Sequence, residues 1–142
     1  GLLGPRVGAY AGFRIDETKA IGLRASITSI DGTYNKGTEI VRVDVPIEAT
    51  IVSIGAYMHG TAFDRLYAGL TLSINTDQTR ADTGVNMMTS VWDSGVSIGL
   101  EAGIDLLRMG RHRIGVLGQL EGELATNASW AGFSLGLGYR LY

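Results

Sequence analysis

The sequence alternates apolar residues with polar or small ones at a period of two over most of its length. Successive side chains of a strand point to opposite faces, so this period indicates strands with one apolar face. The predicted segments are residues 7–15, 21–28, 41–48, 52–59, 65–74, 96–106, 113–124 and 131–141. About eight such strands, an even number, predict an all-β fold in which a closed antiparallel up-and-down barrel crosses a membrane.

Polar residues and glycines predict where the strands end. The expected turns are Asp16–Thr18, Asp31–Gly32, residues 48–51, residues 60–64 and residues 108–111 around Gly110. The turn at 48–51 is expected because the alternation changes phase near Thr50. Pro46 is unusual within the predicted strand 41–48, because proline cannot donate to the ladder and prefers edges, strand ends or bulges. The polar stretch 75–90 is expected to be the long loop, joining the fifth and sixth strands on the outer side of the membrane.

The charged residues of the strands fall on the face opposite the aliphatic ones. They are six arginines and six carboxylates: Arg14, Arg24, Arg42, Arg65, Arg113, Arg140, Asp44, Glu48, Glu101, Asp105, Glu121 and Glu123. If that face met water, the barrel would be a soluble lipocalin-like carrier and would have to enclose about forty apolar side chains, more than an eight-stranded barrel holds. We therefore expect a barrel-interior network of salt bridges, with the apolar face toward lipid.

Composition supports this choice and excludes several classes of protein. The chain has 45% hydrophobic residues, 21 Gly, only 18% charged residues and a mean hydropathy of +0.16, an unusual balance for a soluble domain. A net charge of −2 gives no basic surface for nucleic acid, so no nucleic-acid partner is expected. The absence of Cys excludes disulfides and Cys-based zinc sites. No signal peptide is visible at Gly1, as expected of a processed, exported chain or a trimmed one.

The C-terminal segment 133–141 carries a family resemblance. Its residues, Phe-Ser-Leu-Gly-Leu-Gly-Tyr-Arg-Leu, resemble the closing strand of small outer-membrane barrels of the OmpA and OmpX type, although Leu141 replaces the usual terminal Phe and Tyr142 is additional. The resemblance implies a transmembrane barrel located in a bacterial outer membrane, and the length of 142 residues predicts a single domain over residues 1–142. It also implies an insertion signal that the barrel-assembly machinery recognises, formed by Phe133, Leu135, Leu137, Tyr139 and Leu141.

Candidate catalytic groups are few. His59 and His112 are expected to be ordinary rim residues, because the sequence lacks the His-x-Ser pair of lipid A deacylases. Glu121 and Glu123 share a face and could act as acid and base or bind a cation, but nearby arginines favour salt bridges. The acidic residues of the expected long loop lack EF-hand spacing, so a solvated loop is favoured over a calcium site. Aromatic residues near the predicted strand ends match an interfacial aromatic belt; they are Trp92, Trp130, Tyr139 and Tyr142.

These observations predict a protein that is not an enzyme and has no cofactor or metal. The expected role is a structural anchor or an envelope interaction protein that contacts outer-membrane lipid and a possible envelope partner. A narrow passive, porin-like pore and the soluble carrier of apolar ligands remain as alternatives, and a lipid-modifying enzyme is a further one.

Overall fold

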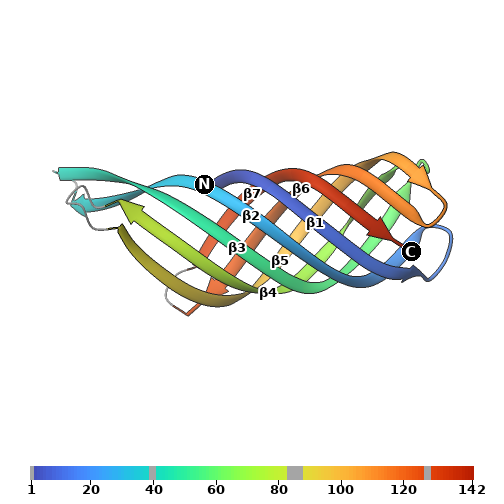
Figure 1. The fold of residues 1–142 in the computed structure, drawn as a ribbon, viewed down its shortest axis with the longest axis horizontal. Helices are drawn as coiled ribbons and strands as arrows, with labels where there is room; N and C mark the ends of the chain where they lie inside the picture. The colour runs from blue at the N-terminus through green and yellow to red at the C-terminus, as the bar shows by residue number, and fades with distance from the viewer. Residues whose placement is uncertain (1, 39–40, 83–87, 127–128) are drawn as a thin grey trace.

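The computed structural model describes residues 2–38, 41–82, 88–126 and 129–142, with side chains over 4–31, 47–80, 92–126 and 131–142. Within these residues the chain forms seven strands that wind obliquely around one long axis (Figure 1). The strands are β1 Leu2–Arg14, β2 Lys19–Thr38, β3 Val41–Ala62, β4 Leu66–Asp82, β5 Met88–Met109, β6 His112–Ala125 and β7 Ser129–Leu141. In the described part of the chain, no helix is long and apolar enough to span a membrane.

The strands follow one another around a closed barrel in sequence order. Every sequential pair is antiparallel, which confirms the predicted all-β, up-and-down arrangement. The ring closes between β1 and β7, which run parallel from Leu2 opposite Gly132 to Ala11 opposite Leu141. This pairing is parallel because an odd number of alternating strands leaves the first and last pointing the same way.

Short turns join the strands at the end of the barrel where the C-terminus lies, which we call the turn end (Figure 1). In the first turn, Oδ1 of Asp16 accepts hydrogen bonds from the backbone N–H of Thr18 at 2.7 Å and of Lys19 at 2.8 Å. These bonds, the one from Thr18 above all, hold the pKa of Asp16 below its usual value. Gly110 has a positive φ of 59°, which glycine adopts without strain. The predicted turns at Asp16–Thr18 and around Gly110 are confirmed.

Two other predicted turns are wrong, and the described residues form seven strands where about eight were predicted. β3 runs without a break through residues 48–51, where Thr50 pairs with Ser29 of β2 and with Gln78 of β4. β2 likewise continues through Asp31, which pairs with Glu48. The two segments predicted at 41–48 and 52–59 are therefore one strand.

The phase change near Thr50 has a different cause from a turn. Ile30 and Ile51 point into the barrel and are each 3% exposed, while Ser29 and Thr50 point outward. Apolar residues thus move from the outer face to the inner face as β2 and β3 leave the turn end. The strand continues while its two faces exchange polarity, and a sequence pattern alone cannot distinguish this from a turn.

The long loop predicted at 75–90 is also largely wrong. β4 continues to Asp82, and β5 begins at Met88, opposite Asp82. The polar residues of this stretch therefore lie mostly in paired strands. Pro46, which the prediction also placed within a strand, lies within β3 opposite Thr33.

Candidate functional site

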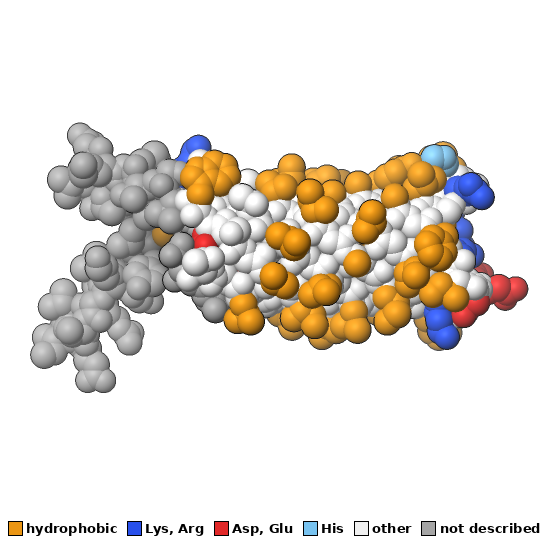
Figure 2. Space-filling model, turned by 90° about the horizontal axis from the view of Figure 1, so that it is seen from below, with side chains coloured by type: hydrophobic (Ala, Val, Ile, Leu, Met, Phe, Trp, Pro, Cys, Tyr) orange, Lys and Arg blue, Asp and Glu red, His pale blue; other side chains and the backbone are white. Residues whose placement is uncertain are grey.

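The outer wall of the barrel carries a wide band of exposed apolar side chains. On β4 and β5 the outward residues include Leu72, Ile74 and Ile98, which are 57%, 69% and 63% exposed. Figure 2 shows such side chains spread over the middle of one face, with charged side chains gathered at the turn end. An isolated exposed leucine is ordinary, but a contiguous apolar band of this extent marks a surface that meets something other than water.

The band has a sharp edge on the side away from the turn end. There, two residues beyond the last apolar residue of β2 to β6, the outward residue is polar: Ile27 is followed by Ser29, Val52 is preceded by Thr50, Ile74 is followed by Thr76, Val96 is preceded by Ser94 and Leu124 is followed by Thr126. The last apolar residues are register partners: Ile27 with Val52, Ile74 with Val96 and Val96 with Leu124. The edge therefore follows register partners across β2 and β3 and across β4, β5 and β6, and it shifts by two residues between β3 and β4, where Val52 pairs with Thr76.

The interior of the barrel holds charged side chains that contact one another across the lumen. Nη1 of Arg6 lies 3.0 Å from Oε2 of Glu121, and Nη2 of Arg24 lies 3.7 Å from the other oxygen of Glu121. Glu121 also accepts hydrogen bonds from Ser97 and from Nε2 of Gln119, the latter at 2.9 Å. All these side chains are at most 6% exposed. Burial makes an unpaired charge very unfavourable, and this carboxylate is matched by two guanidinium groups.

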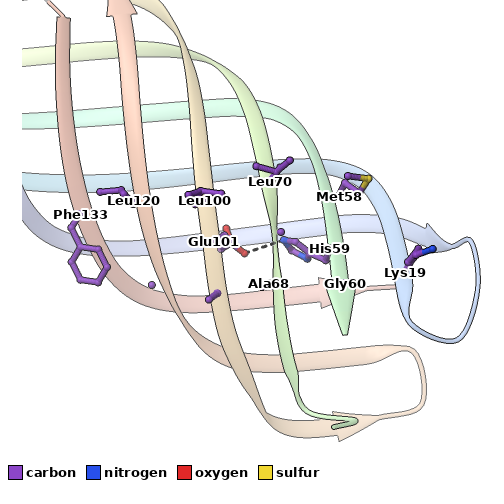
Figure 3. A pocket seen from close by; sticks show the side chains of 13 residues that line it. Lys19, Met58, His59, Gly60, Ala68, Leu70, Leu100, Glu101, Leu120 and Phe133 are labelled. Atoms are coloured by element: carbon purple, nitrogen blue, oxygen red, sulfur yellow. Dashed lines mark ion pairs between the residues drawn. The ribbon is translucent and has the colours of Figure 1, made fainter. Parts of the chain in front are cut away.

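A second cluster lies nearer the turn end, around Glu101. Its Oε2 accepts a hydrogen bond from the Tyr10 hydroxyl at 2.5 Å and lies 3.9 Å from Nη1 of Arg24. Its Oε1 lies 3.2 Å from Nε2 of His59 (Figure 3). The His59 ring lies at a tilt to the rings of Tyr57 and Tyr67, with ring centroids 4.4 Å and 5.0 Å away. Glu101 on β5 thus contacts side chains from β1, β2 and β3.

Two more polar groupings lie at the two ends of this network. Towards the turn end, Arg140 pairs with Asp105 and its guanidinium carbon lies 3.3 Å from the centroid of the Tyr67 ring. At the other end, Asn75 donates a hydrogen bond to Glu123. Together the groupings fill the barrel with polar contacts from β1 to β7.

The structure brings together some of the predicted interior charges and leaves others out. Arg24, Glu101, Asp105, Glu121, Glu123 and Arg140 are buried inside the barrel. Arg14 and Arg65 are exposed, contrary to prediction, because they lie beside turns and their long side chains reach water. Glu48 is exposed on the outward face of β3, beyond the edge of the apolar band, and Arg113 is half-buried near the turn end. The side chains of Arg42 and Asp44 lie outside the described residues.

Sequence reasoning missed several interior residues. Arg6 is 2% exposed and shares the inward parity of Tyr10, but it precedes the predicted start of the first strand. His59 was expected at the rim and is instead 1% exposed, because β3 continues to Ala62 and carries His59 inside. Gln119 is fully buried and donates to Thr71 at 3.1 Å. Extending the alternation toward the N-terminus would have found Arg6, whereas His59 and Gln119 already share the inward face of segments 52–59 and 113–124 and were left out because the network was drawn from Arg, Asp and Glu alone.

The residues of the predicted insertion signal lie on β7 and face outward. Phe133, Leu135, Leu137 and Tyr139 are between 39% and 55% exposed, and Leu141 is half-buried. Tyr142 packs against the buried aromatic cluster at the turn end, with the guanidinium of Arg14 5.7 Å from its ring centroid. Trp92 is 64% exposed on β5, and the side chain of Trp130 lies outside the described residues.

The arrangement of the remaining reactive groups offers little catalytic chemistry. His59 and Glu101 are 1% and 2% exposed, so a substrate in solution cannot reach them. His112 is exposed at the turn end, where its Nδ1 lies 2.5 Å from the Tyr139 hydroxyl. Among the residues that the structure describes, no group of three His, Cys, Asp or Glu side chains could hold a metal ion.

No family model matches the chain, and searches of curated proteins and of solved structures gave no significant match.

Proposed function

We propose that this chain is a transmembrane barrel of a bacterial outer membrane, with a non-enzymatic role as a structural anchor or envelope interaction protein. The observation that carries the proposal is the continuous band of exposed apolar side chains around a barrel whose buried side chains are charged. A soluble lipocalin-like carrier needs the opposite arrangement, with apolar side chains lining its lumen.

The height of the band supports a bilayer as its environment. On β5 the outward apolar residues extend from Val96 to Leu106. At a rise of about 3.3 Å per residue this is about 33 Å along the strand, and a tilt of about 35–45° converts it to a height of about 23–27 Å. Outer-membrane barrels carry an apolar band about 25 Å tall, so the two dimensions agree.

The edge of the band also fits a membrane interface. Beyond it Ile30 and Ile51 point inward and Ser29 and Thr50 outward, which is the pattern of a barrel that has left hydrocarbon and entered water. Closure of the ring meets a further requirement, because strands in hydrocarbon cannot leave their backbone N–H and C=O groups unpaired.

The resemblance of residues 133–141 to the closing strands of OmpA- and OmpX-type barrels supports the outer membrane as the location and the barrel-assembly machinery as the partner during insertion. The structure departs from such barrels in one respect: the described residues form seven strands, and bacterial barrels of one chain have an even number.

The interior favours an anchor over a pore. Arg24, Glu101 and Arg140 are at most 2% exposed, so water does not reach them along the lumen. Since these groups lie at successive levels of the barrel, an ion would have to break several buried ion pairs to cross. We therefore expect the protein to give no stable conductance steps in planar bilayers, whereas regular steps would favour the pore.

The proposal is tested by folding the purified chain into phospholipid vesicles. We expect the protein to stay with the vesicles after extraction with urea or carbonate, and to migrate faster on a detergent gel before heating than after it. A chain that dissolves without detergent, leaves the vesicles and shows no heat-dependent migration would overturn the proposal.

A further inference from the structure

A groove of about 810 Å³ lies on the outer wall of the barrel, within the apolar band (Figure 3). Its floor is a row of small residues on four neighbouring strands: Gly60, Ala68, Ala102 and Gly118. They form one continuous register row, in which Gly60 pairs with Ala68, Ala68 with Ala102 and Ala102 with Gly118. The groove therefore crosses β3, β4, β5 and β6 as a single furrow.

A ridge of large side chains borders the furrow two residues away along each strand. It consists of Met58, Leu70, Leu100, Leu120 and Phe133, and these too are register partners in sequence. On the other side stand Leu66, Ile104 and Val116, which also face outward. The furrow is thus apolar along its length and bordered by large side chains on both sides where it crosses β4, β5 and β6.

The width of the furrow limits what can bind in it. Each ridge is two residues from the floor, about 6.6 Å along the strand, so the backbones beneath the two ridges are about 13 Å apart, and the large side chains take up much of that space. An α-helix with its side chains is about 10–12 Å across and would rest on the ridges without reaching the floor. The remaining width suits one hydrocarbon chain.

A cation stands at the mouth of the furrow. Lys19 pairs with Gly60 in the register between β2 and β3, so it continues the floor row to the turn end, and it also lines the groove. Its Nζ lies 3.7 Å from Oδ2 of Asp16 in an ion pair between exposed side chains, and such pairs contribute little energy. The Lys19 ammonium is therefore available to a phosphate at the membrane surface.

We propose that this furrow binds one acyl chain of an anionic glycerophospholipid whose phosphate contacts Lys19. The inference rests on the proposed membrane location and adds a specific lipid site to it. Strand spacing of about 4.8 Å puts Gly118 of β6, the last small residue of the row, about 19 Å from Lys19, so the furrow is long enough for most of an acyl chain.

The test measures lipid retained on the barrel. The chain is folded into vesicles of phosphatidylglycerol and phosphatidylcholine in equal amounts with identical acyl chains, released in a mild detergent and weighed with its lipids by native mass spectrometry. We expect one retained phosphatidylglycerol on the unaltered chain. Ala102→Leu, which fills the floor, should lower its retention about tenfold, the effect of removing roughly two methylene contacts. Ala68→Leu should act in the same way.

Matched variants separate the site from general effects of the wall. Ala25 is an exposed outward alanine on β2 that does not line the groove, so Ala25→Leu should leave retention unchanged. Lys19→Gln should make the retention of phosphatidylglycerol equal to that of phosphatidylcholine. Arg108→Gln, which removes another cation at the rim, should leave the preference for phosphatidylglycerol unchanged.

Several outcomes would overturn the inference: retention unaffected by both furrow-filling variants, equal retention of phosphatidylcholine by the unaltered chain, or a dimer whose formation depends on Ala102. If the barrel inserts into vesicles and yet retains no lipid, the furrow inference fails and the proposed function stands. If the barrel does not insert at all, it is the proposed function that fails.

Discussion

The guanidinium of Arg6 on β1 lies 3.0 Å from the carboxylate of Glu121 on β6, and β7 stands between their strands in the ring. The contact spans the lumen beside the parallel closure and ties the first strand to the sixth. Arg6 also donates a hydrogen bond to Ser26 at 2.5 Å, so its side chain joins three strands.

We predict that Arg6→Ala lowers the free energy of unfolding by about 2–4 kcal/mol, because it leaves the buried carboxylate of Glu121 with less positive charge. A double-mutant cycle with Glu121→Ala, followed by urea unfolding in lipid vesicles, should give a coupling energy above about 1 kcal/mol. Arg14→Ala, at an exposed arginine of the same strand, should change the free energy by less than about 0.5 kcal/mol. A coupling near zero would contradict the contact.

The second prediction concerns Leu72, which is 57% exposed in the middle of the apolar band on β4. In hydrocarbon, Leu72→Arg should destabilise the barrel by about 2–4 kcal/mol, whereas in water the same change would have little effect. The matched control is Thr76→Arg, on the same face of the same strand beyond the edge of the band, which should be nearly neutral. Equal effects at the two positions, measured by urea unfolding in vesicles, would argue against a lipid-facing wall.

Gly103 illustrates how the interior is packed. It lies directly opposite Tyr67, and a Cβ built on Gly103 would meet the Tyr67 ring and the Val116 carbonyl oxygen at 2.5 Å. Gly103→Ala should therefore destabilise the barrel by about 1–3 kcal/mol through overpacking. Gly122→Ala is the control, since nothing lies within 4 Å of its Cβ, and it should change stability by less than about 0.5 kcal/mol. Thermal unfolding in detergent measures both, and a neutral Gly103→Ala would refute this packing.

Sequence alternation alone predicted much of the fold, because a period of two assigns a face to every residue of a strand. Arg24 and Glu101 could be placed on one face in this way, and the structure buries both. The alternation could not show that Arg24 reaches Glu121 or that His59 reaches Glu101, because those contacts depend on which strands face one another across the lumen.

The errors arose where the environment of a face changes along one strand. Near Thr50 the apolar residues move from the outward to the inward face, and a reading that assumes one environment per face takes this change for a turn. Polar residues such as Asp77 and Gln78 were assigned to a loop for the same reason, although both lie in β4.

The continuity of β3 gives a prediction that hydrogen exchange can test. Thr50 and Ile51 have strand partners on both sides, so their amides should exchange far more slowly than that of Glu17 in the first turn. Residue-resolved exchange in detergent micelles measures the three amides in one experiment. Exchange at Thr50 as fast as at Glu17 would indicate a turn at residues 48–51 and therefore an additional strand.

The most direct test of the account places spin labels along β4 in a chain folded into lipid vesicles. Because the chain contains no Cys, single cysteines can be introduced at each position from 66 to 80 without removing others. In vesicles, labels at even positions 66–74 should collide readily with oxygen dissolved in lipid, and those at 76, 78 and 80 with a water-soluble nickel chelate. Labels at odd positions, such as 71 and 73, should be poorly accessible to both. Greater exposure to the nickel chelate than to oxygen at positions 70, 72 and 74 would show that water covers the apolar wall, and would contradict the account.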